Sequence, residues 1–338
     1  MAAASELPGA DTLAPYDKDD HIGYVRADGW IKVHLRDGRP SGFKALTDPS
    51  LVVKRNGKPD IYEWWFNGHR HRDDDMPAVD DQDAWQEWWF HGRRHREGDK
   101  PAVMRKLCDE WWLNGFRHRD DNKPAVVQCD KSWTTKRKEW WVRGARARPD
   151  GGPTLEDFDG SVYWHVGDLL HRTDGPAAIK KDGTRWWYLN GHRHRDGGPA
   201  VERPDGSWEW WREGAVHRDD GPASQDADGT LEWRRGGLKH RDDGPAVEGR
   251  TGRCEWWVRG CRHRGADLPA IVDPDEDREE WWVDDARHRD GNRPAVVVGK
   301  GRKARREWWV EGKRIESVAV PVCLLPDDLR ELCAPEKK

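Results

Sequence analysis

The feature that most constrains this chain is a segment of about 23 residues that recurs along most of its length. The first clear copy reads EWWFNGHRHRDDDMPAV and runs from Glu63 to Val79. Extra residues in longer copies fall only just before Pro-Ala or between Pro-Ala-Val and the next tryptophan pair, so both places are loops. The first tryptophans of the eleven copies are Trp64, Trp88, Trp111, Trp140, Trp164, Trp187, Trp210, Trp233, Trp256, Trp281 and Trp308.

Each copy carries the pattern of a tight β-hairpin. Asn67-Gly68, Asn114-Gly115 and Asn190-Gly191 are two-residue turn signals, because both residue types tolerate positive φ. The flanking segments alternate and are rich in aromatic and β-branched residues, which favours strands. Proline lacks an N–H, so we expect Pro-Ala at a bulge or a strand end. A single hairpin of this kind cannot bury its apolar face, but stacked hairpins can.

Placing Asn67-Gly68 in the turn predicts which residues face each other in the first hairpin, and side chains then alternate between its two faces. The face of the first tryptophan and its histidine partner is predicted to be the core, and its next pair is mostly apolar in other copies. The face of the second tryptophan is predicted to be exposed, with Trp–Arg stacking beside a Glu–Arg ion pair. The predicted pairs are Phe66 with His69, Trp65 with Arg70, Trp64 with His71, and Glu63 with Arg72.

The predicted exposed face is the candidate binding surface, since Trp and Arg are enriched in binding hot spots. The other interpretation is a solvated face that is stiffened by stacking. Aromatic rings among arginines could also stack nucleic-acid bases, but the interleaved Glu and Asp argue against that. The candidate residues are Trp65, Arg70, Trp89, Arg94, Trp112, Arg117, Trp141, Arg146, Trp257, Arg262, Trp282 and Arg287.

These patterns predict an all-β fold, an elongated array of antiparallel β-hairpins in a twisted meander or solenoid, with a short C-terminal helix. At about 4.8 Å per strand, the array would span on the order of 100 Å. We expect a flexible tail at 1–18, an N-terminal cap with a degenerate repeat at 19–60, and eleven hairpin repeats at 61–316. The cap at 317–338 combines a strand in SVAVPVC with the helix in LPDDLRELC.

Composition and charge argue against several classes of protein. Lys and Arg number 59 against 63 Asp and Glu, so the chain is not dominated by phosphate binding. There is no 18-residue apolar run and no signal-peptide pattern, so we expect neither a transmembrane segment nor secretion. The six cysteines form no CxxC pair, which indicates reduced thiols. The expected location is the cytoplasm or, for a viral protein, the virion.

The recurring His-Arg-Asp triplet is the only pattern that suggests catalysis. His118-Arg119-Asp120 resembles a kinase catalytic loop, but Ala125 stands where that loop needs Asn. A catalytic site is usually single, so nine equivalent histidines indicate structure instead, with one ring nitrogen bonded to neighbouring backbone. We predict no catalytic residue and no cofactor.

Two further patterns concern metal ions. His69 and His71 form a His-x-His pair, as do His192 and His194, but neither pair has an evident third ligand. Asp runs lie at a turn, where Asp is favoured anyway. We therefore predict no metal site, and cation binding by the Asp-rich turns is left open.

W-x-x-N-G-x-x-H near a 23-residue period resembles the MORN repeat, in its W-W-x-N-G-x-x-H-R-x-D-G-P-A variant, over about residues 49–316. Proteins of similar pattern occur in bacteria and in giant DNA viruses of amoebae. This chain lacks the Tyr-x-Gly step before the tryptophan and has His-Arg, as at His71-Arg72, where His-Gly is usual. The resemblance implies elongated antiparallel sheets that scaffold, dimerise, or dock onto membranes and other proteins.

The function expected from the repeat and the resemblance is a non-enzymatic scaffold for protein–protein interaction or structural assembly, for example a virion protein. The alternative is a monomeric adaptor that binds a host protein or a membrane surface through its Trp–Arg face. The expected partners are unidentified proteins or further copies of the chain, as a dimer or end to end. No residue pattern supports the membrane surface.

Overall fold

The computed structural model describes residues 49–55, 58–66, 68–82, 84–134 and 136–315. It also describes the backbone of four N-terminal strands, β1 (Ala14–Tyr16), β2 (His21–Arg26), β3 (Gly29–Arg36) and β4 (Arg39–Pro40). Over these residues the protein is all-β, and its one helical element is the 3-10 turn η3 (Gly301–Lys303). The all-β array of antiparallel hairpins is thus confirmed, whereas the predicted C-terminal cap lies outside the described residues.

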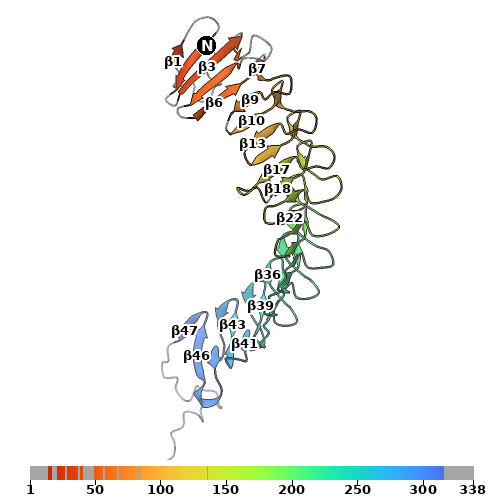
Figure 1. Cartoon of the computed structure of the whole chain (residues 1–338). Coiled ribbons are helices and arrows are strands. Elements are labelled where there is room, and N and C mark those ends of the chain that lie inside the picture. The colour runs from red at the N-terminus through yellow and green to blue at the C-terminus, as the bar shows by residue number, and fades with distance from the viewer. Residues whose placement is uncertain are drawn as a thin grey trace, which may run out of the picture. The chain divides into compact units, whose positions relative to one another are not determined.

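The chain divides into two units, Met1–Leu170 and His171–Lys338. In the first unit, consecutive main-sheet strands pair antiparallel in a meander (Figure 1). At the N-terminal end of this sheet, β3 pairs with β2 on one side and with β5 on the other. The strands of this main sheet are β5 (Leu51–Arg55), β6 (Lys58–Glu63), β9 (Val79–Asp81), β10 (Trp85–Glu87), β13 (Val103–Arg105), β14 (Cys108–Glu110), β17 (Val126–Cys129), β18 (Lys136–Glu139), β21 (Leu155–Glu156) and β22 (Val162–Tyr163).

After each pair of main-sheet strands, the chain of the first unit forms a separate two-stranded hairpin. These hairpins are β7 (Trp65–Phe66) with β8 (His69–Arg70), β11 (Trp89–Phe90) with β12 (Arg93–Arg94), β15 (Trp112–Leu113) with β16 (Phe116–Arg117), β19 (Trp141–Val142) with β20 (Ala145–Arg146), and β23 (His165–Val166) with β24 (Leu169–Leu170).

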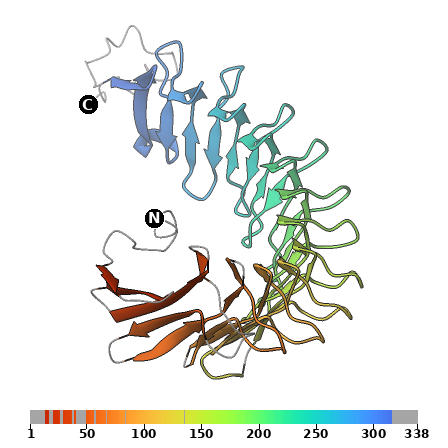
Figure 2. The ribbon, with the colours of Figure 1, turned by 90° about the horizontal axis from the view of Figure 1, so that it is seen from above.

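The second unit repeats this plan. Its main sheet comprises β25 (Ala178–Ile179), β26 (Arg185–Trp186), β29 (Val201–Glu202), β30 (Trp208–Glu209), β33 (Ser224–Gln225), β34 (Leu231–Glu232), β37 (Val247–Glu248), β38 (Cys254–Glu255), β41 (Ile271–Asp273), β42 (Arg278–Glu280), β45 (Val296–Val298) and β46 (Arg305–Val310). Its hairpins are β27 (Tyr188–Leu189) with β28 (His192–Arg193), β31 (Trp211–Arg212) with β32 (Ala215–Val216), β35 (Arg234–Arg235) with β36 (Leu238–Lys239), β39 (Trp257–Val258) with β40 (Cys261–Arg262), β43 (Trp282–Val283) with β44 (Ala286–Arg287), and β46 with β47 (Lys313–Ile315). Loops of successive repeats stand in a row along one edge of each unit (Figure 2).

The first tryptophan of each repeat is where the chain leaves the main sheet. Glu63 ends β6 and Trp65 begins β7, while Trp64 lies between them and its N–H donates to the carbonyl of Ala78 at 2.8 Å. The alanine that follows Pro is fully buried, with no exposed surface at Ala78, Ala102 and their equivalents. Pro-Ala stands directly before a main-sheet strand, as predicted for a residue that cannot donate a ladder hydrogen bond.

The predicted hairpin register is correct within the hairpin and wrong at its base. Trp65 pairs with Arg70 and Phe66 with His69, and Asn114 and Asn190 adopt positive φ in their turns. Glu63, however, does not face Arg72.

The partners of Glu63 and Arg72 explain this error. Glu63 pairs with Leu51 and Val79 in the main sheet. The backbone N–H of Arg72 donates to the carbonyl oxygen of Trp89 in the next repeat at 3.3 Å. The prediction treated strand and hairpin as one continuous ribbon, but the chain bends between them.

The bend also overturns the predicted faces. Trp64 and His71 are buried, as expected, but their neighbour Phe66 on the predicted core face is 39% exposed. The equivalent pairs Leu113 with Phe116, Val166 with Leu169, and Val258 with Cys261 likewise lie outside the buried core. The second-tryptophan face, predicted to be exposed, is instead half-buried.

Candidate functional site

The second tryptophan of each repeat belongs to a polar cluster built on a buried glutamate. In the first repeat, Glu63 accepts hydrogen bonds from Trp65 Nε1 at 2.9 Å and from Arg70 Nη2 at 2.9 Å. Glu87 binds Trp89 and Arg94 in the same way, at 2.7 and 2.9 Å. A buried carboxylate is costly unless it is paired and hydrogen-bonded, which these contacts provide. The same Glu–Trp–Arg cluster recurs at Glu110, Glu139 and Glu280.

Four of the cluster arginines, Arg70, Arg94, Arg117 and Arg287, also stack between the tryptophans of two successive repeats, whereas Arg146 stacks on Trp141 alone. The guanidinium carbon of Arg94 lies 5.0 Å from the ring centre of Trp89 and 5.2 Å from that of Trp112. Arg262 lies similarly between Trp257 and Trp282, at 4.5 and 5.0 Å. We call this alternation of second tryptophans and arginines the inner ladder.

The twelve residues predicted as an exposed binding surface all belong to the inner ladder. The structure does bring them together, but every one of them is half-buried. Eleven of them bind a buried glutamate, whereas Arg262 lies 3.5 Å from Asp285, and the arginine stacks, except that of Arg146, reach the adjacent repeat. The arrangement joins neighbouring repeats, so the prediction that this face is exposed was wrong.

The inner ladder is interrupted where the second tryptophan is replaced. His165 takes that position in one repeat, and its Nδ1 lies 2.8 Å from Thr154 Oγ1. Burial, followed by the charge of Arg146, lowers the pKa of His165 to about 4. Arg234 occupies the second-tryptophan position in another repeat. It is paired with Glu232 at 2.8 Å, which offsets the cost of placing a charge there.

A second row of stacks, the outer ladder, involves the first tryptophan and the arginine of His-Arg. The guanidinium of Arg72 lies 3.6 Å from the ring centre of Trp64, and its Nη1 donates to the carbonyl of Pro77 at 3.0 Å. Equivalent stacks recur in both units, for example Arg289 over Trp281 at 3.7 Å. The sequence reasoning missed this role, although the arginine stands eight residues after the first tryptophan in nearly every repeat.

The outer ladder explains the glycine of Gly-Pro-Ala. A Cβ added at Gly221 would lie 3.0 Å from the guanidinium carbon of Arg218, and one at Gly244 only 2.8 Å from that of Arg241. Neither glycine is in the left-handed region, so glycine is needed here for side-chain space and not for backbone freedom.

The repeated histidines bond through one ring nitrogen to neighbouring backbone, as predicted, and the structure shows that this backbone belongs to the next repeat. His71 Nδ1 accepts a hydrogen bond from the N–H of His91 at 3.2 Å, and His71 Nε2 binds Asp73 at 3.1 Å. Because Nδ1 is an acceptor, the neutral tautomer with the proton on Nε2 is assigned. Burial is the main reason that the pKa of His71 is lowered. The same Nδ1 contact recurs at His95, His118, His171, His194, His217, His240 and His288.

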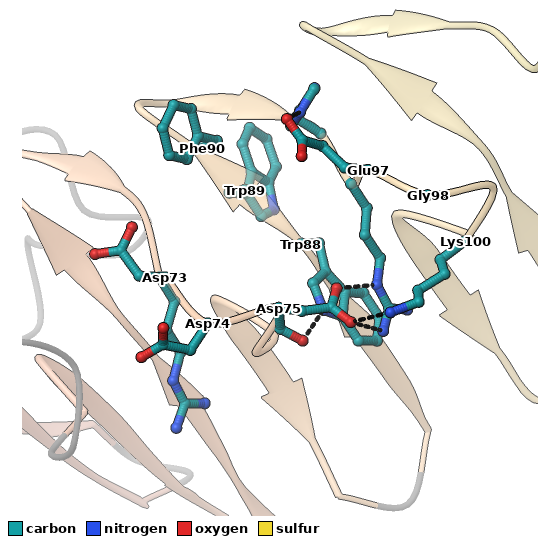
Figure 3. A pocket seen from close by; sticks show the side chains of 12 residues that line it. Asp73, Asp74, Asp75, Trp88, Trp89, Phe90, Glu97, Gly98 and Lys100 are labelled. Atoms are coloured by element: carbon teal, nitrogen blue, oxygen red, sulfur yellow. Dashed lines mark hydrogen bonds and ion pairs between the residues drawn. The ribbon is translucent and has the colours of Figure 1, made fainter.

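A hollow of about 460 Å³ lies between the first two repeats (Figure 3). Asp75 crosses it to Arg96 and Lys100, at 2.6 and 2.7 Å, and these hydrogen bonds lower the pKa of Asp75 to about 2. A hollow between equivalent residues of the second unit contains Asp267, Arg289 and Trp281 in the same places. The hollow is therefore a product of the repeat.

Metal ligation finds no support in the described part of the chain, where no group of three or more His, Cys, Asp or Glu side chains is placed to hold an ion. Cys108, Cys129, Cys254 and Cys261 are free thiols, and burial raises the pKa of Cys108. Across the described residues, no helix has the length and apolar character needed to cross a membrane.

The surface that the hairpins do expose is their rim, which we define as the residue pair nearest each hairpin turn. In the first unit these pairs include Phe66 with His69, Phe90 with Arg93, and Leu113 with Phe116. Phe90 and Phe116 are 46% and 56% exposed. These residues were predicted to be core, and their exposure follows from the bend at the first tryptophan.

No family model matches this sequence, and no curated protein matches it. The resemblance to MORN repeats therefore stays a prediction that is carried by the repeated residues.

Proposed function

We propose that the protein is a non-enzymatic repeat scaffold that presents regularly spaced surfaces for protein–protein interaction or structural assembly. A role in a viral particle is one form of structural assembly, and it derives from the MORN resemblance. The runner-up is a monomeric adaptor, which would bind one partner without assembling.

One observation carries the proposal: the polar groups that could do chemistry are used to join repeats. Glu87, Arg94 and Trp89 bind one another, and Arg94 also stacks on the next repeat. His71 is bonded to the backbone of the next repeat. Such nearest-neighbour contacts are what stabilise repeat arrays, whose long surfaces serve in binding.

The adaptor form must use a surface other than the inner ladder. Substituting Trp89 or Arg94 would remove partners of Glu87, which is 3% exposed, and would destabilise the fold. A loss of partner capture in such a variant would therefore be ambiguous. The exposed hairpin rim is the surface on which binding and stability can be separated.

A dilution series of the full chain, measured by light scattering with negative-stain electron microscopy on the same samples, tests the proposal. Mass that grows with concentration supports structural assembly. Constant monomer mass, together with a partner identified by cross-linking to the intact chain, supports the adaptor. Constant monomer mass with no reproducible cross-linked partner would overturn the scaffold proposal in both forms.

A further inference from the structure

The first three repeats combine an apolar rim with a regular row of carboxylates. Phe66, Phe90 and Leu113 occupy the rim position on the first strand of each hairpin, and an acid follows each of them after seven residues. These acids are Asp73, Glu97 and Asp120, whose side chains are 52%, 90% and 82% exposed. Each lies beside a histidine Nε2, at 3.1, 3.7 and 2.9 Å respectively.

The apolar and acidic rows lie against each other. The ring of Phe90 packs on His71 with 4.9 Å between ring centres, and His71 binds Asp73. Phe90, Asp73 and Glu97 line the same hollow, which Figure 3 shows from close by. A partner that covers the rim would therefore meet apolar side chains and carboxylates in alternation.

The second unit shows what kind of group fits this position. Two of its repeats have arginine at the rim, and each arginine binds the acid seven residues later: Arg212 binds Asp219 at 3.5 Å and Arg235 binds Asp242 at 3.0 Å. A guanidinium at the rim can therefore reach the carboxylate. In the first three repeats the rim residue on the first strand is Phe, Phe and Leu, so this first-strand position supplies no such cation, although Arg93 stands opposite Phe90 on the second strand of its hairpin.

We propose that the rim of the first three repeats is a docking surface for an extended, basic segment of a partner protein. Apolar side chains of the segment cover Phe66, Phe90 and Phe116, and its Lys or Arg side chains bind Asp73, Glu97 and Asp120 as Arg212 and Arg235 bind their acids in the second unit. The carboxylates exclude nucleic acid and an anionic membrane by charge. This inference rests on the proposed scaffold function and names the chemistry of its partner.

The repeat spacing sets the register of the segment. Successive repeats are two strands apart, which corresponds to about 9.6 Å at about 4.8 Å per strand. One turn of a polyproline II helix, which is three residues, covers about 9.3 Å and returns the side chain to the same face, whereas residues three apart in a β-strand point to opposite faces. The segment therefore places one basic side chain at about every third residue.

Three labelled peptides test this inference by fluorescence anisotropy on the full chain. The first has three Arg-Leu-Ser triplets, whose nine residues cover about 28 Å at about 3.1 Å per residue, close to the length of three repeats at about 9.6 Å each. The second has the same composition with its arginines clustered, and the third has Glu in place of Arg. We expect the first to bind at least about tenfold more tightly than the other two, with affinity that falls as salt is raised.

Two variants locate the binding site. Asp73→Asn, Glu97→Gln and Asp120→Asn together should weaken binding at least about tenfold, because the amides keep an acceptor for each histidine but lose the charge. The matched control is Asp219→Asn with Asp242→Asn, whose acids are already occupied by arginine, and it should leave binding unchanged. Thermal unfolding of both variants confirms that they are folded.

A gain of binding gives an independent check. Arg212→Leu with Arg235→Leu should create a second rim of the proposed kind, and the peptide stoichiometry should rise from one to two. Equal binding of the three peptides, or unchanged binding by the triple variant, would overturn the inference. Self-association that the triple variant abolishes would assign the rim to a second copy and would also overturn it.

The two proposals can fail separately. If no peptide binds but the dilution series shows assembly or a cross-linked partner, the docking inference falls and the scaffold proposal stands. If the dilution series and the cross-linking also fail, both fall.

Discussion

Replacing Glu280 with alanine tests whether the buried glutamates hold the repeats together. Glu280 is 2% exposed, and it binds Arg278, Arg287 Nε at 3.0 Å and Trp282 Nε1 at 2.9 Å. Removing one partner of a buried ion pair costs about 3–5 kcal/mol. Arg278 and Arg287 are about one-third exposed and can regain water, so we expect Glu280→Ala to lower the free energy of unfolding by about 2–3 kcal/mol.

Glu276→Ala is the matched control, because Glu276 also binds Arg278, at 3.3 Å, but is 59% exposed. An exposed pair of this kind contributes at most about 1 kcal/mol. Urea unfolding followed by circular dichroism measures both variants, and hydrogen exchange at β42 and β45 shows whether the loss is local, since repeat arrays can depart from two-state unfolding. Equal effects of the two substitutions would refute the reasoning.

The pH dependence of the same variants gives a second test. Burial raises the pKa of Glu280, but hydrogen bonding to Arg278 and the charges of Arg287 and Arg278 outweigh it, and the net pKa is lowered from 4.5. A lowered acid pKa in the folded state contributes stability that is present above the unfolded pKa and is lost as the pH falls. The difference between the wild type and Glu280→Ala should therefore shrink below pH 4.5. A difference that stays constant down to pH 3 would contradict the assignment.

Three further outcomes are expected. Gly221→Ala should displace the guanidinium of Arg218 and cost about 1–2 kcal/mol in urea unfolding, whereas Gly265→Ala, whose Cβ meets nothing within 4 Å, should be near neutral. The wild type should lose stability, at most about 3 kcal/mol before solvent screening, as the pH falls from 6.5 to about 4, because His165 takes up its proton in the unfolded chain first. His165→Phe should remove this loss. Asp75→Asn should cost at most about 1 kcal/mol at neutral pH, and thermal unfolding should show that this difference disappears as the pH falls from 3.8 to about 2. Equal costs of the two glycine substitutions would contradict the first assignment. A pH dependence of stability in His165→Phe or Asp75→Asn that equals that of the wild type would contradict the other two.

Local chemistry explains the predictions that were confirmed. Asn and Gly in the turn determine the register of the hairpin, so Trp65 was correctly paired with Arg70. The nine equivalent histidines were predicted to be structural, with one ring nitrogen bonded to neighbouring backbone, and His71 Nδ1 does accept a hydrogen bond from a backbone N–H. These features depend on residues close together in the chain, which is why the residue pattern was enough.

The exposure of each face depended on tertiary structure. Alternation of side chains predicts faces only within one continuous strand, and the chain bends at Trp64 between β6 and β7. Glu63 therefore lies in the main sheet, where it meets Arg70 and not Arg72, and Phe66 turns outward. By itself, the amino-acid pattern determined the repeat, the hairpin and its register. Only the packing of each repeat against the next decided that the Trp–Arg row is half-buried and the rim exposed, because both depend on where the neighbouring repeat places its tryptophan.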